Sequence, residues 1–505
     1  MSQKFFITTP IYYINDKPHI GHAYTTVLAD VISKYRSLMG DEVFFLTGTD
    51  EHGQKCEKSA KSRGLTPQAL ADEMVINYQD LWAKLGITYS RFIRTTDKDH
   101  VTNVQTLFQK LIDQGDIYKA SYEGMYSISE EAFVPSSQLK EMEEQGLASD
   151  LVHLKEDTYF FKLSSYQQRL LDFYESHPRF VTPEFRFNEV KSFVKGGLQD
   201  LSLSRNTVKW GIPVPQDPEH VVYVWFDALL NYLTGAQSHF PPDLQIVGKD
   251  ILRFHAVYWP AFLMALNLPL PKEILAHGWW LMNDSKMSKS KGNIVTPDRL
   301  LIYGSEPLRY FFVRDMQVGN DRAFTDDAFI DRLNADLANG LGNLLSRSLT
   351  MVQKYLGSRL PVPRLPISDK ETFELHQTAE KKLHDALSGI RSNNIHTALE
   401  TWWQLLRIAD SFIAEKKPWV LAKDESKSLE VNDCLYTLVQ ILRATAVLIH
   451  PIMPQMSLSI LRQMGYQDPL GQINLIDLDL NAELPITLAT FSPLFQRIEK
   501  SKESI

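Results

Sequence analysis

The feature that most constrains the fold is an apolar strand that runs into an amphipathic helix at the start of the chain. The run 5–7, Phe-Phe-Ile, is typical of a buried strand. A helical pattern follows and stops at Gly40, and its apolar face holds Leu28, Val31, Ile32, Tyr35 and Leu38. The segment His19-Ile20-Gly21-His22 therefore lies where the strand gives way to the helix.

The same strand-then-helix pattern repeats. Residues 42–46 are predicted to form a second buried strand, which leads into Thr47-Gly48-Thr49-Asp50-Glu51-His52-Gly53. The helix expected after it has Thr66 as its N-cap and Gly86 as its stop. This alternation predicts an α/β fold with a doubly wound, Rossmann-like parallel sheet. Polar residues at the carboxyl ends of such strands line the ligand crevice, and Asp50 has that position.

The histidine segment points to phosphate binding. The start of a helix presents free N–H groups and a partial positive charge. His19 and His22 can donate hydrogen bonds to phosphate oxygens, and Gly21 lets a ligand approach the backbone. Alone, a segment of four residues is more often a simple turn.

A basic segment lies far along the chain. Lys286-Met287-Ser288-Lys289-Ser290 follows an apolar run and reads as a polar loop rich in ammonium groups. Most such clusters are solvated surface. Together with the histidine segment, however, it forms a paired signature, in which the histidine motif lies near the N-terminus and the lysine loop lies late in the α/β part of the chain.

Changes of pattern predict five segments. Short strand signals interrupt the sheet pattern from about residue 115, and from about residue 331 the chain reads as almost wholly helical. In that helical part Leu333 begins an apolar repeat of four residues, with Asn343 and Arg347 on the opposite face. The expected segments are a nucleotide-binding domain in two halves (1–114 and 221–285), an α+β insertion (115–220), a lysine-loop linking domain (286–330) and an all-α domain (331–505).

The composition of the chain limits the class of protein that it can encode. The chain has 505 residues, 44% hydrophobic and 23% charged, which is ordinary for a globular protein of several domains. No apolar run is long enough to span a membrane. Cys56 and Cys434 are the two cysteines, and such low use fits a reducing cytosol. The first expected strand begins near residue 4, so we expect no targeting peptide and a cytoplasmic protein.

The paired histidine and lysine motifs resemble those of class I aminoacyl-tRNA synthetases. Four further stretches are similar to the methionyl-tRNA synthetase family in particular. They are Phe6-Ile7-Thr8-Thr9-Pro10-Ile11-Tyr12-Tyr13, the segment 47–53, Tyr223-Val224-Trp225-Phe226-Asp227-Ala228 and Phe254-His255-Ala256-Val257-Tyr258-Trp259-Pro260.

The resemblance implies a reaction in two steps. ATP, with Mg²⁺, activates L-methionine to methionyl-adenylate, and the methionyl group then passes to tRNA(Met), including the initiator tRNA. The catalytic residues that the resemblance implies are His19, His22, Lys286 and Lys289. Those implied to bind ATP are Gly21, Lys249, Ser288 and Ser290.

The resemblance also implies a methionine pocket. A thioether tail suits an apolar, aromatic pocket, because sulfur gains about 0.3–1.5 kcal/mol from contact with a ring. Asp50 can pair with the ammonium group of the substrate. The implied pocket residues are Ile11, Tyr13, Asp50, Trp225, Ala228, Tyr232, Ile251, His255 and Trp259. Each aromatic residue alone is more often part of a core.

The helical domain is expected to read the anticodon. Asn343, Arg347 and Trp419 match family positions implicated in anticodon contact, and unpaired bases are bound by stacking and by hydrogen bonds to their edges. The chain has serines in the stretch 125–131, where many relatives carry zinc-binding cysteine pairs. We therefore expect no structural zinc. The chain ends near the close of the helical domain, which predicts a monomer.

Three alternatives compete with this interpretation. A class I synthetase for another amino acid would need a larger editing insertion or zinc-binding thiolates. A small nucleotidyltransferase would lack the helical domain. A catalytically inactive tRNA-binding protein would have no need of His19, His22, Lys286 and Lys289.

Overall fold

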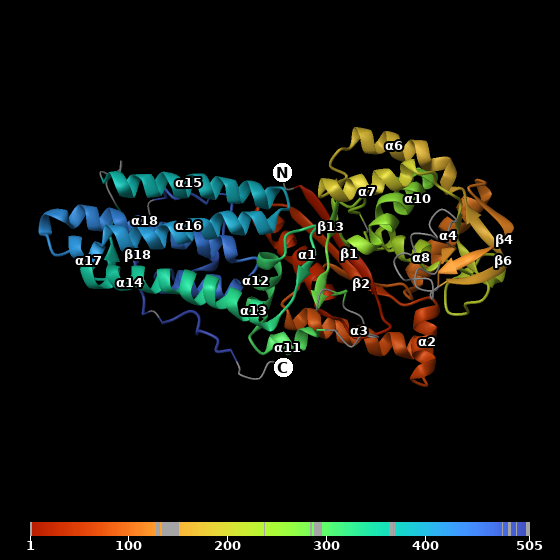
Figure 1. The fold of residues 1–505 in the computed structure, drawn as a ribbon, viewed down its shortest axis with the longest axis horizontal. Coiled ribbons are helices and arrows are strands. Elements are labelled where there is room, and N and C mark those ends of the chain that lie inside the picture. Colours follow the sequence, from red (N-terminus) through yellow and green to blue (C-terminus); the bar gives the residue numbers. More distant parts are fainter. Residues whose placement is uncertain are drawn as a thin grey trace. The chain divides into compact units, whose positions relative to one another are not determined.

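Figure 1 shows the computed structural model of the chain. It describes residues 3–127, 132–133, 151–236, 238–282, 285–286, 295–362, 367, 369–476, 478–482, 486–490 and 492–500. The chain divides into two compact units. The sheet unit comprises Lys4–Ala29 and Val43–Gly278, and the helical unit comprises Met1–Gln3, Asp30–Glu42 and Trp279–Ile505.

The core of the sheet unit is a six-stranded sheet in the order β3-β2-β1-β12-β13-β7. The pairs β1–β12, β12–β13, β13–β7 and β2–β3 are parallel. The strands are β1 (Lys4–Tyr13), β2 (Glu42–Asp50), β3 (Arg91–Arg94), β7 (Val181–Thr182), β12 (Leu244–Gly248) and β13 (Ile274–His277). After β1, the strands β2 and β3 are added on one side of it, and β12 and β13 are added later on its other side. The sheet therefore has its switch point between β1 and β12, where open α/β sheets bind ligands.

Helices cover the sheet as the sequence predicts. The run 5–10 of β1 is buried without interruption, as is typical of a parallel strand covered on both faces. Thr66 caps its helix by accepting a hydrogen bond from the Ala69 N–H, which confirms that expectation. The helices of this unit are α1 (Ile20–Leu38, shared with the helical unit), α2 (Gln54–Ser62), α3 (Pro67–Lys84), α4 (Lys98–Asp113), α6 (Gln167–Ser176), α7 (Glu184–Lys195), α8 (Val224–Leu229), α9 (Asn231–Gly235) and α10 (Trp259–Leu266).

Two smaller antiparallel sheets lie in the segment between β3 and β12. One has the order β5-β4-β6-β8 and the other β10-β11-β9. Their strands are β4 (Ile117–Ser127), β5 (Ala132–Phe133), β6 (Leu151–Phe161), β8 (Leu201–Ser202), β9 (Ser204–Arg205), β10 (Pro213–Val214) and β11 (Asp217–Val222). Strand β7 comes from the same segment but pairs with β13, so the insertion also contributes the outer strand of the main sheet.

The helical unit is built around long helices, of which α15, α16 and α18 pack against one another. Its helices are α11 (Pro297–Leu301), α12 (Ser305–Asp315), α13 (Asp326–Leu333), α14 (Asn343–Leu356), α15 (Lys370–Arg391), α16 (Ile395–Lys416), α17 (Pro418–Leu421), α18 (Ser428–Ile449) and α19 (Pro454–Gln463). Its short strands are β14 (Trp280–Met282), β15 (Ser285–Lys286), β16 (Arg322–Ala323), β17 (Arg359–Leu360) and β18 (Ile486–Thr487). Across the described residues, no helix is long and apolar enough to cross a membrane.

The leucine repeat that begins at Leu333 falls on three consecutive helical pieces. A π-helical segment, Asn334–Gly342, joins α13 to α14. An α-helix has about 3.6 residues per turn, so a repeat of four drifts around it, whereas the wider π-helical turn takes up that drift. The leucines stay buried as a result, namely Leu333, Leu337, Leu341, Leu345 and Leu349.

Candidate active site

The start of α1 holds His22, and His19 immediately before the helix, in a defined arrangement. The His19 N–H donates to Nδ1 of His22 at 3.2 Å, and the Gly21 N–H donates to Nδ1 of His19 at 3.0 Å. The two rings stack with their centroids 3.8 Å apart. Because each Nδ1 is an acceptor, each neutral ring carries its proton on Nε2. Both rings therefore offer an N–H donor.

Electrostatics keep one of these rings neutral. Burial lowers the pKa of His22 well below its ordinary value, and the neighbouring His19 lowers it further. A neutral donor can bind a phosphate oxygen without bringing a buried positive charge into the free enzyme. Gly21 is tightly placed in the same turn, since a Cβ there would lie 2.8 Å from Cε1 of His19. Any larger residue would push the His19 ring aside.

The carboxyl ends of four strands supply the rest of this edge. β1 ends at Tyr13, β2 at the buried Asp50, β12 at Gly248 and β13 at His277. Lys249 follows β12 directly. Because parallel strands end at one edge of a sheet, the predicted residues Tyr13, Asp50 and Lys249 come from the same edge.

His277 ties this edge to α1, and it was not among the predicted site residues. Nδ1 of His277 lies 2.8 Å from the Gly278 carbonyl oxygen, and Nε2 lies 2.8 Å from Oγ1 of Thr25, on the turn of α1 that follows His22. Burial lowers the pKa of His277, so the ring is neutral. Oγ1 of Thr25 also lies 3.0 Å from the Gly21 carbonyl oxygen, so this hydroxyl links His277 to the turn that carries the two histidines.

An aromatic cluster surrounds Trp225, and its member Tyr13 ends β1, the strand next to the one that ends at Asp50. The rings of Tyr13 and Trp225 meet edge to face with centroids 6.4 Å apart, and Phe254 stacks flat on Trp225 at 3.8 Å. The Lys55 ammonium lies 5.1 Å from the centroid of the Tyr13 ring. Phe254 and Lys55 were not among the predicted site residues, because nothing in their spacing separates them from core or surface positions.

Behind this cluster lies a buried polar pair. The Tyr232 hydroxyl is 2.7 Å from Nε2 of His255, and Nδ1 of His255 is 2.9 Å from the Ile251 carbonyl oxygen. Burial lowers the pKa of His255 to about 4, although its bond to the Ile251 carbonyl acts in the opposite sense. The neutral ring therefore donates from Nδ1 and accepts at Nε2 from the Tyr232 hydroxyl.

The predicted pocket residues thus form two layers. Ile11, Tyr13, Trp225 and Ile251 are only partly buried. The buried layer consists of Ala228, Tyr232, His255 and Trp259, and the Trp259 ring centroid lies 5.9 Å from that of Tyr232. All of these residues belong to the sheet unit. The partly exposed aromatic rings form a wall suited to a flexible apolar side chain.

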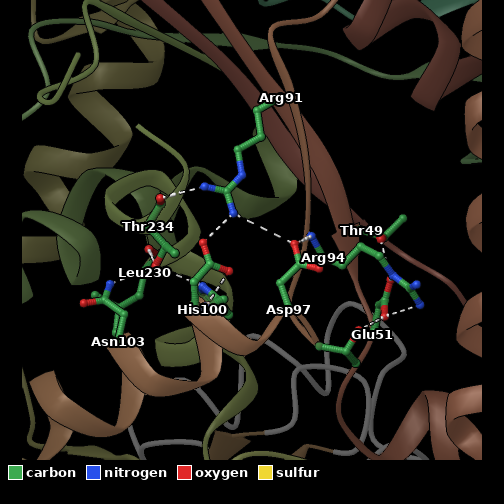
Figure 2. A network of polar contacts seen from close by, with 11 residues as sticks. Thr49, Glu51, Arg91, Arg94, Asp97, His100, Asn103, Leu230 and Thr234 are labelled. Carbon is green, nitrogen blue, oxygen red and sulfur yellow. Dashed lines mark hydrogen bonds and ion pairs between the residues drawn. The ribbon is translucent and has the colours of Figure 1, made fainter. Parts of the chain in front are cut away.

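The segment after Asp50 is held by a carboxylate network that sequence analysis missed. Glu51 accepts hydrogen bonds from Nε of Arg94 at 2.7 Å and from the Thr49 hydroxyl at 2.7 Å, as Figure 2 shows. Thr96 adds a third donor at 2.6 Å. This network fixes the backbone on both sides of Asp50.

The predicted anticodon residues lie in the helical unit. Asn343 is exposed at the start of α14, and Arg347 forms an ion pair of 2.5 Å with Asp410 of α16. Trp419 is 37% exposed on α17, two residues after Lys417, whose backbone is left-handed (φ 51°). That reversal of the chain presents the indole ring at the surface.

The roles of the lysine-loop residues and the expected absence of structural zinc stay predictions. Lys289, Ser288 and Ser290 lie outside the described residues, and Lys286 is described only as backbone in β15. Residues 128–131 of the serine stretch also lie outside them. Within the described parts of the chain, no group of three or more His, Cys, Asp or Glu side chains could hold a metal ion. Cys56 and Cys434 are buried free thiols.

The parallel sheet with its switch point beside β1, and the two histidines at the start of α1, fit a class I aminoacyl-tRNA synthetase. The family model "tRNA synthetases class I (M)" matches residues 5–144 and 147–349. Methionine–tRNA ligase of Halalkalibacterium halodurans is 44% identical over 99% of this chain and 79% of its own length. That of Bacillus subtilis is 44% identical over 92% of this chain and 73% of its own length.

Solved structures support the same family. Mycobacterium tuberculosis methionyl-tRNA synthetase in complex with methionyl-adenylate superposes with a TM-score of 0.90 and 40% identity, covering 98% of this chain and 100% of that one. Its free form gives a TM-score of 0.85. The chain belongs to the methionine–tRNA ligase family, whose reaction is the ATP-dependent joining of methionine to its tRNA.

Proposed function

We propose that this ligase activates L-methionine at the carboxyl edge of the main sheet, with the residue roles derived below. The observation that carries the proposal is the aromatic wall of Tyr13 and Trp225, backed by the Tyr232–His255 pair, with the buried Asp50 at the end of the neighbouring strand β2. Asp50 pairs with the substrate ammonium, and the wall packs on the thioether. The M. tuberculosis relative, solved with methionyl-adenylate, supports the same intermediate here.

Activation needs charge stabilisation more than proton transfer. The methionine carboxylate is already an anion when it attacks the α-phosphorus of ATP, and pyrophosphate leaves. His19 and His22 donate their Nε2 hydrogens to phosphate oxygens, and Gly21 leaves space for the nucleotide. Lys249, Lys286 and Lys289 add positive charge along the triphosphate, with Ser288 and Ser290 as hydrogen-bond donors.

Mg²⁺ enters this scheme with ATP. The described residues hold no carboxylate cluster that would bind the ion by itself, so the phosphates supply its main ligands. In the second step a ribose hydroxyl of the terminal tRNA adenosine attacks the adenylate carbonyl, the bond from the carbonyl carbon to the phosphate oxygen breaks, and AMP leaves. Asn343, Arg347 and Trp419 read the anticodon of tRNA(Met), the initiator tRNA included.

Two wider expectations complete the proposal. The enzyme acts in the cytoplasm, where the buried free thiols of Cys56 and Cys434 suit a reducing medium. It works as a monomer, and sedimentation of the purified protein would reveal a dimer if that expectation is wrong.

Pyrophosphate exchange tests the activation step. L-methionine should support exchange strongly, and leucine and isoleucine weakly, since pocket shape alone discriminates by about 1–3 kcal/mol per methylene. Lys289→Ala should slow exchange by about 100-fold, as expected for loss of one preorganised charge contact. An unchanged rate in that variant would remove Lys289 from the scheme. Exchange driven best by another amino acid would overturn the proposed pocket.

A further inference from the structure

A buried carboxylate bridges two imidazoles next to the methionine pocket. Asp227 lies on α8 and is 1% exposed. Its Oδ2 is 2.7 Å from Nδ1 of His52, and its Oδ1 is 2.7 Å from Nε2 of His100. Each carboxylate oxygen thus has its own ring partner. The catalytic scheme above assigns no role to these three residues.

The bridge is built around a charged carboxylate. Burial alone would raise the pKa of Asp227, but His52 and His100 outweigh it and hold the pKa below its ordinary value. The carboxylate can only accept, so each ring donates an N–H to it. The charge and both hydrogen bonds are sealed from solvent, where such contacts have most effect.

The three residues come from segments that carry the proposed methionine pocket. His52 follows Asp50 by two residues, in the stretch that the Glu51–Arg94 network already fixes. Asp227 sits on α8 between Trp225 and Ala228. One carboxylate therefore joins the ammonium-binding end of the pocket to the helix that supplies its apolar wall.

His100 adds a third attachment. Its Nδ1 lies 3.1 Å from Oγ1 of Thr234, and the side-chain amide of Asn103 donates a hydrogen bond to the same Oγ1 at 2.8 Å. Figure 2 shows these side chains converging beside α4. Thr234 belongs to α9, the helix of Tyr232. The bridge thus fixes α8 and α9 against α4 as well as against the end of β2.

We propose that Asp227 is a positioning residue for methionine binding, which holds Trp225 and Ala228 at a set distance from Asp50. The inference rests on the proposed roles of Asp50 and the aromatic wall. The physical reason is that a displacement of about 1 Å between binding groups can cost on the order of 100-fold in rate. A substrate that contacts Asp50 and the aromatic wall at the same time should therefore bind less well when the distance between them changes.

Asp227→Asn tests the proposal while keeping the side-chain volume. The amide has one oxygen that accepts and one nitrogen that donates. It can therefore accept a hydrogen bond from His52 or from His100, and the other ring loses its acceptor unless it changes tautomer. In pyrophosphate exchange we expect KM for methionine to rise about tenfold or more, with KM for ATP and kcat changed by less than about threefold. Asp113→Asn is the matched control, because Asp113 lies on α4 as His100 does but is exposed at the end of that helix, where it accepts a hydrogen bond from Gln109. It should leave all three constants unchanged.

A methionine analogue without the amino group, methylthiobutanoate, separates positioning from general damage. It contacts the aromatic wall but has no ammonium for Asp50. Wild-type enzyme should bind methionine more tightly than this analogue, and Asp227→Asn should lose most of that preference while binding the analogue normally. Asp50→Asn should lose the preference too, since it removes the ammonium partner itself.

The outcomes are distinct. If Asp227→Asn weakens methionine and the analogue equally, or raises KM for ATP as much as KM for methionine, its role is structural and the inference is wrong. If Asp50→Asn keeps the preference, the proposed role of Asp50 fails first. A second pair of variants decides the question should Asp227→Asn not fold. His52→Asn places an amide N–H near the position of Nδ1 and should retain methionine binding, whereas His52→Ala should not. Equal behaviour of that pair would also overturn the inference.

Discussion

Hydrogen bonding decides which nitrogen of each active-site imidazole carries its proton, and so what each ring can do. In His19 and His22, Nδ1 accepts a backbone N–H, so Nε2 is the donor available to phosphate. In His255, Nδ1 donates to the Ile251 carbonyl, so Nε2 accepts from Tyr232. The same residue type therefore offers a donor at the proposed nucleotide end and an acceptor at the proposed methionine end. Backbone geometry, which sequence does not display, makes the difference.

The depressed pKa of His255 predicts a pH dependence of stability. The folded-state pKa is about 4, against about 6.5 when the chain is unfolded. Between these values the unfolded state binds a proton that the folded state does not, so stability falls as the pH falls through this window. When the pH falls from 7.5 to 5, the free energy of unfolding of the His255→Gln variant should drop by about 2 kcal/mol less than that of the wild type. Denaturant unfolding at the two pH values measures this, and equal losses in both proteins would contradict it.

At the scale of elements, regular patterns were predictable and isolated contacts were not. The alternation of strands and helices, the Thr66 cap and the start of α1 beside His19 and His22 are confirmed, because each leaves a local pattern. Strand β7 has two residues and no periodicity, so nothing marked it as the outer strand of the main sheet. His52 and His100 lie 175 and 127 residues from Asp227, so only the folded chain brings them together.

The close pairing of β2 and β3 predicts that Gly48 tolerates no side chain. A Cβ at Gly48 would lie 1.9 Å from the carbonyl oxygen of Ile93, its partner in β3, and a backbone atom cannot move aside easily. Gly48→Ala should force the strands apart, destabilise the fold by about 3 kcal/mol, and raise KM for methionine through Asp50, two residues further on. Gly196→Ala is the control, since Gly196 has an ordinary φ of −66° and its Cβ would lie 3.3 Å from the nearest atom.

The control variant should change the free energy of unfolding by less than about 1 kcal/mol. Thermal unfolding and pyrophosphate exchange measure both effects. A Gly48→Ala protein with a wild-type melting temperature would show that β2 and β3 can separate at little cost.

At the scale of the molecule, the proposed chemistry divides between the two units. The histidine turn and the methionine pocket belong to the sheet unit, and the residues proposed to read tRNA belong to the helical unit. In the helical unit, Lys416 is held by three carboxylates, Asp369 at 2.8 Å, Glu371 at 2.9 Å and Glu430 at 2.6 Å. These contacts fix the end of α16, so Trp419 is presented from a rigid base. Activation and tRNA recognition should therefore be separable by mutation.

Trp419→Ala provides that separation. Stacking of one base on an aromatic ring is worth about 1–3 kcal/mol, so charging of tRNA(Met) should fall by about 10- to 100-fold in kcat/KM. Methionine-dependent pyrophosphate exchange without tRNA should stay at the wild-type rate, because the methionine pocket lies in the other unit. Trp419→Phe keeps an aromatic plane on the same backbone and should recover most of the charging activity. If exchange falls together with charging, or if the phenylalanine variant is no better than the alanine variant, Trp419 supports the end of the helix and does not stack on the anticodon.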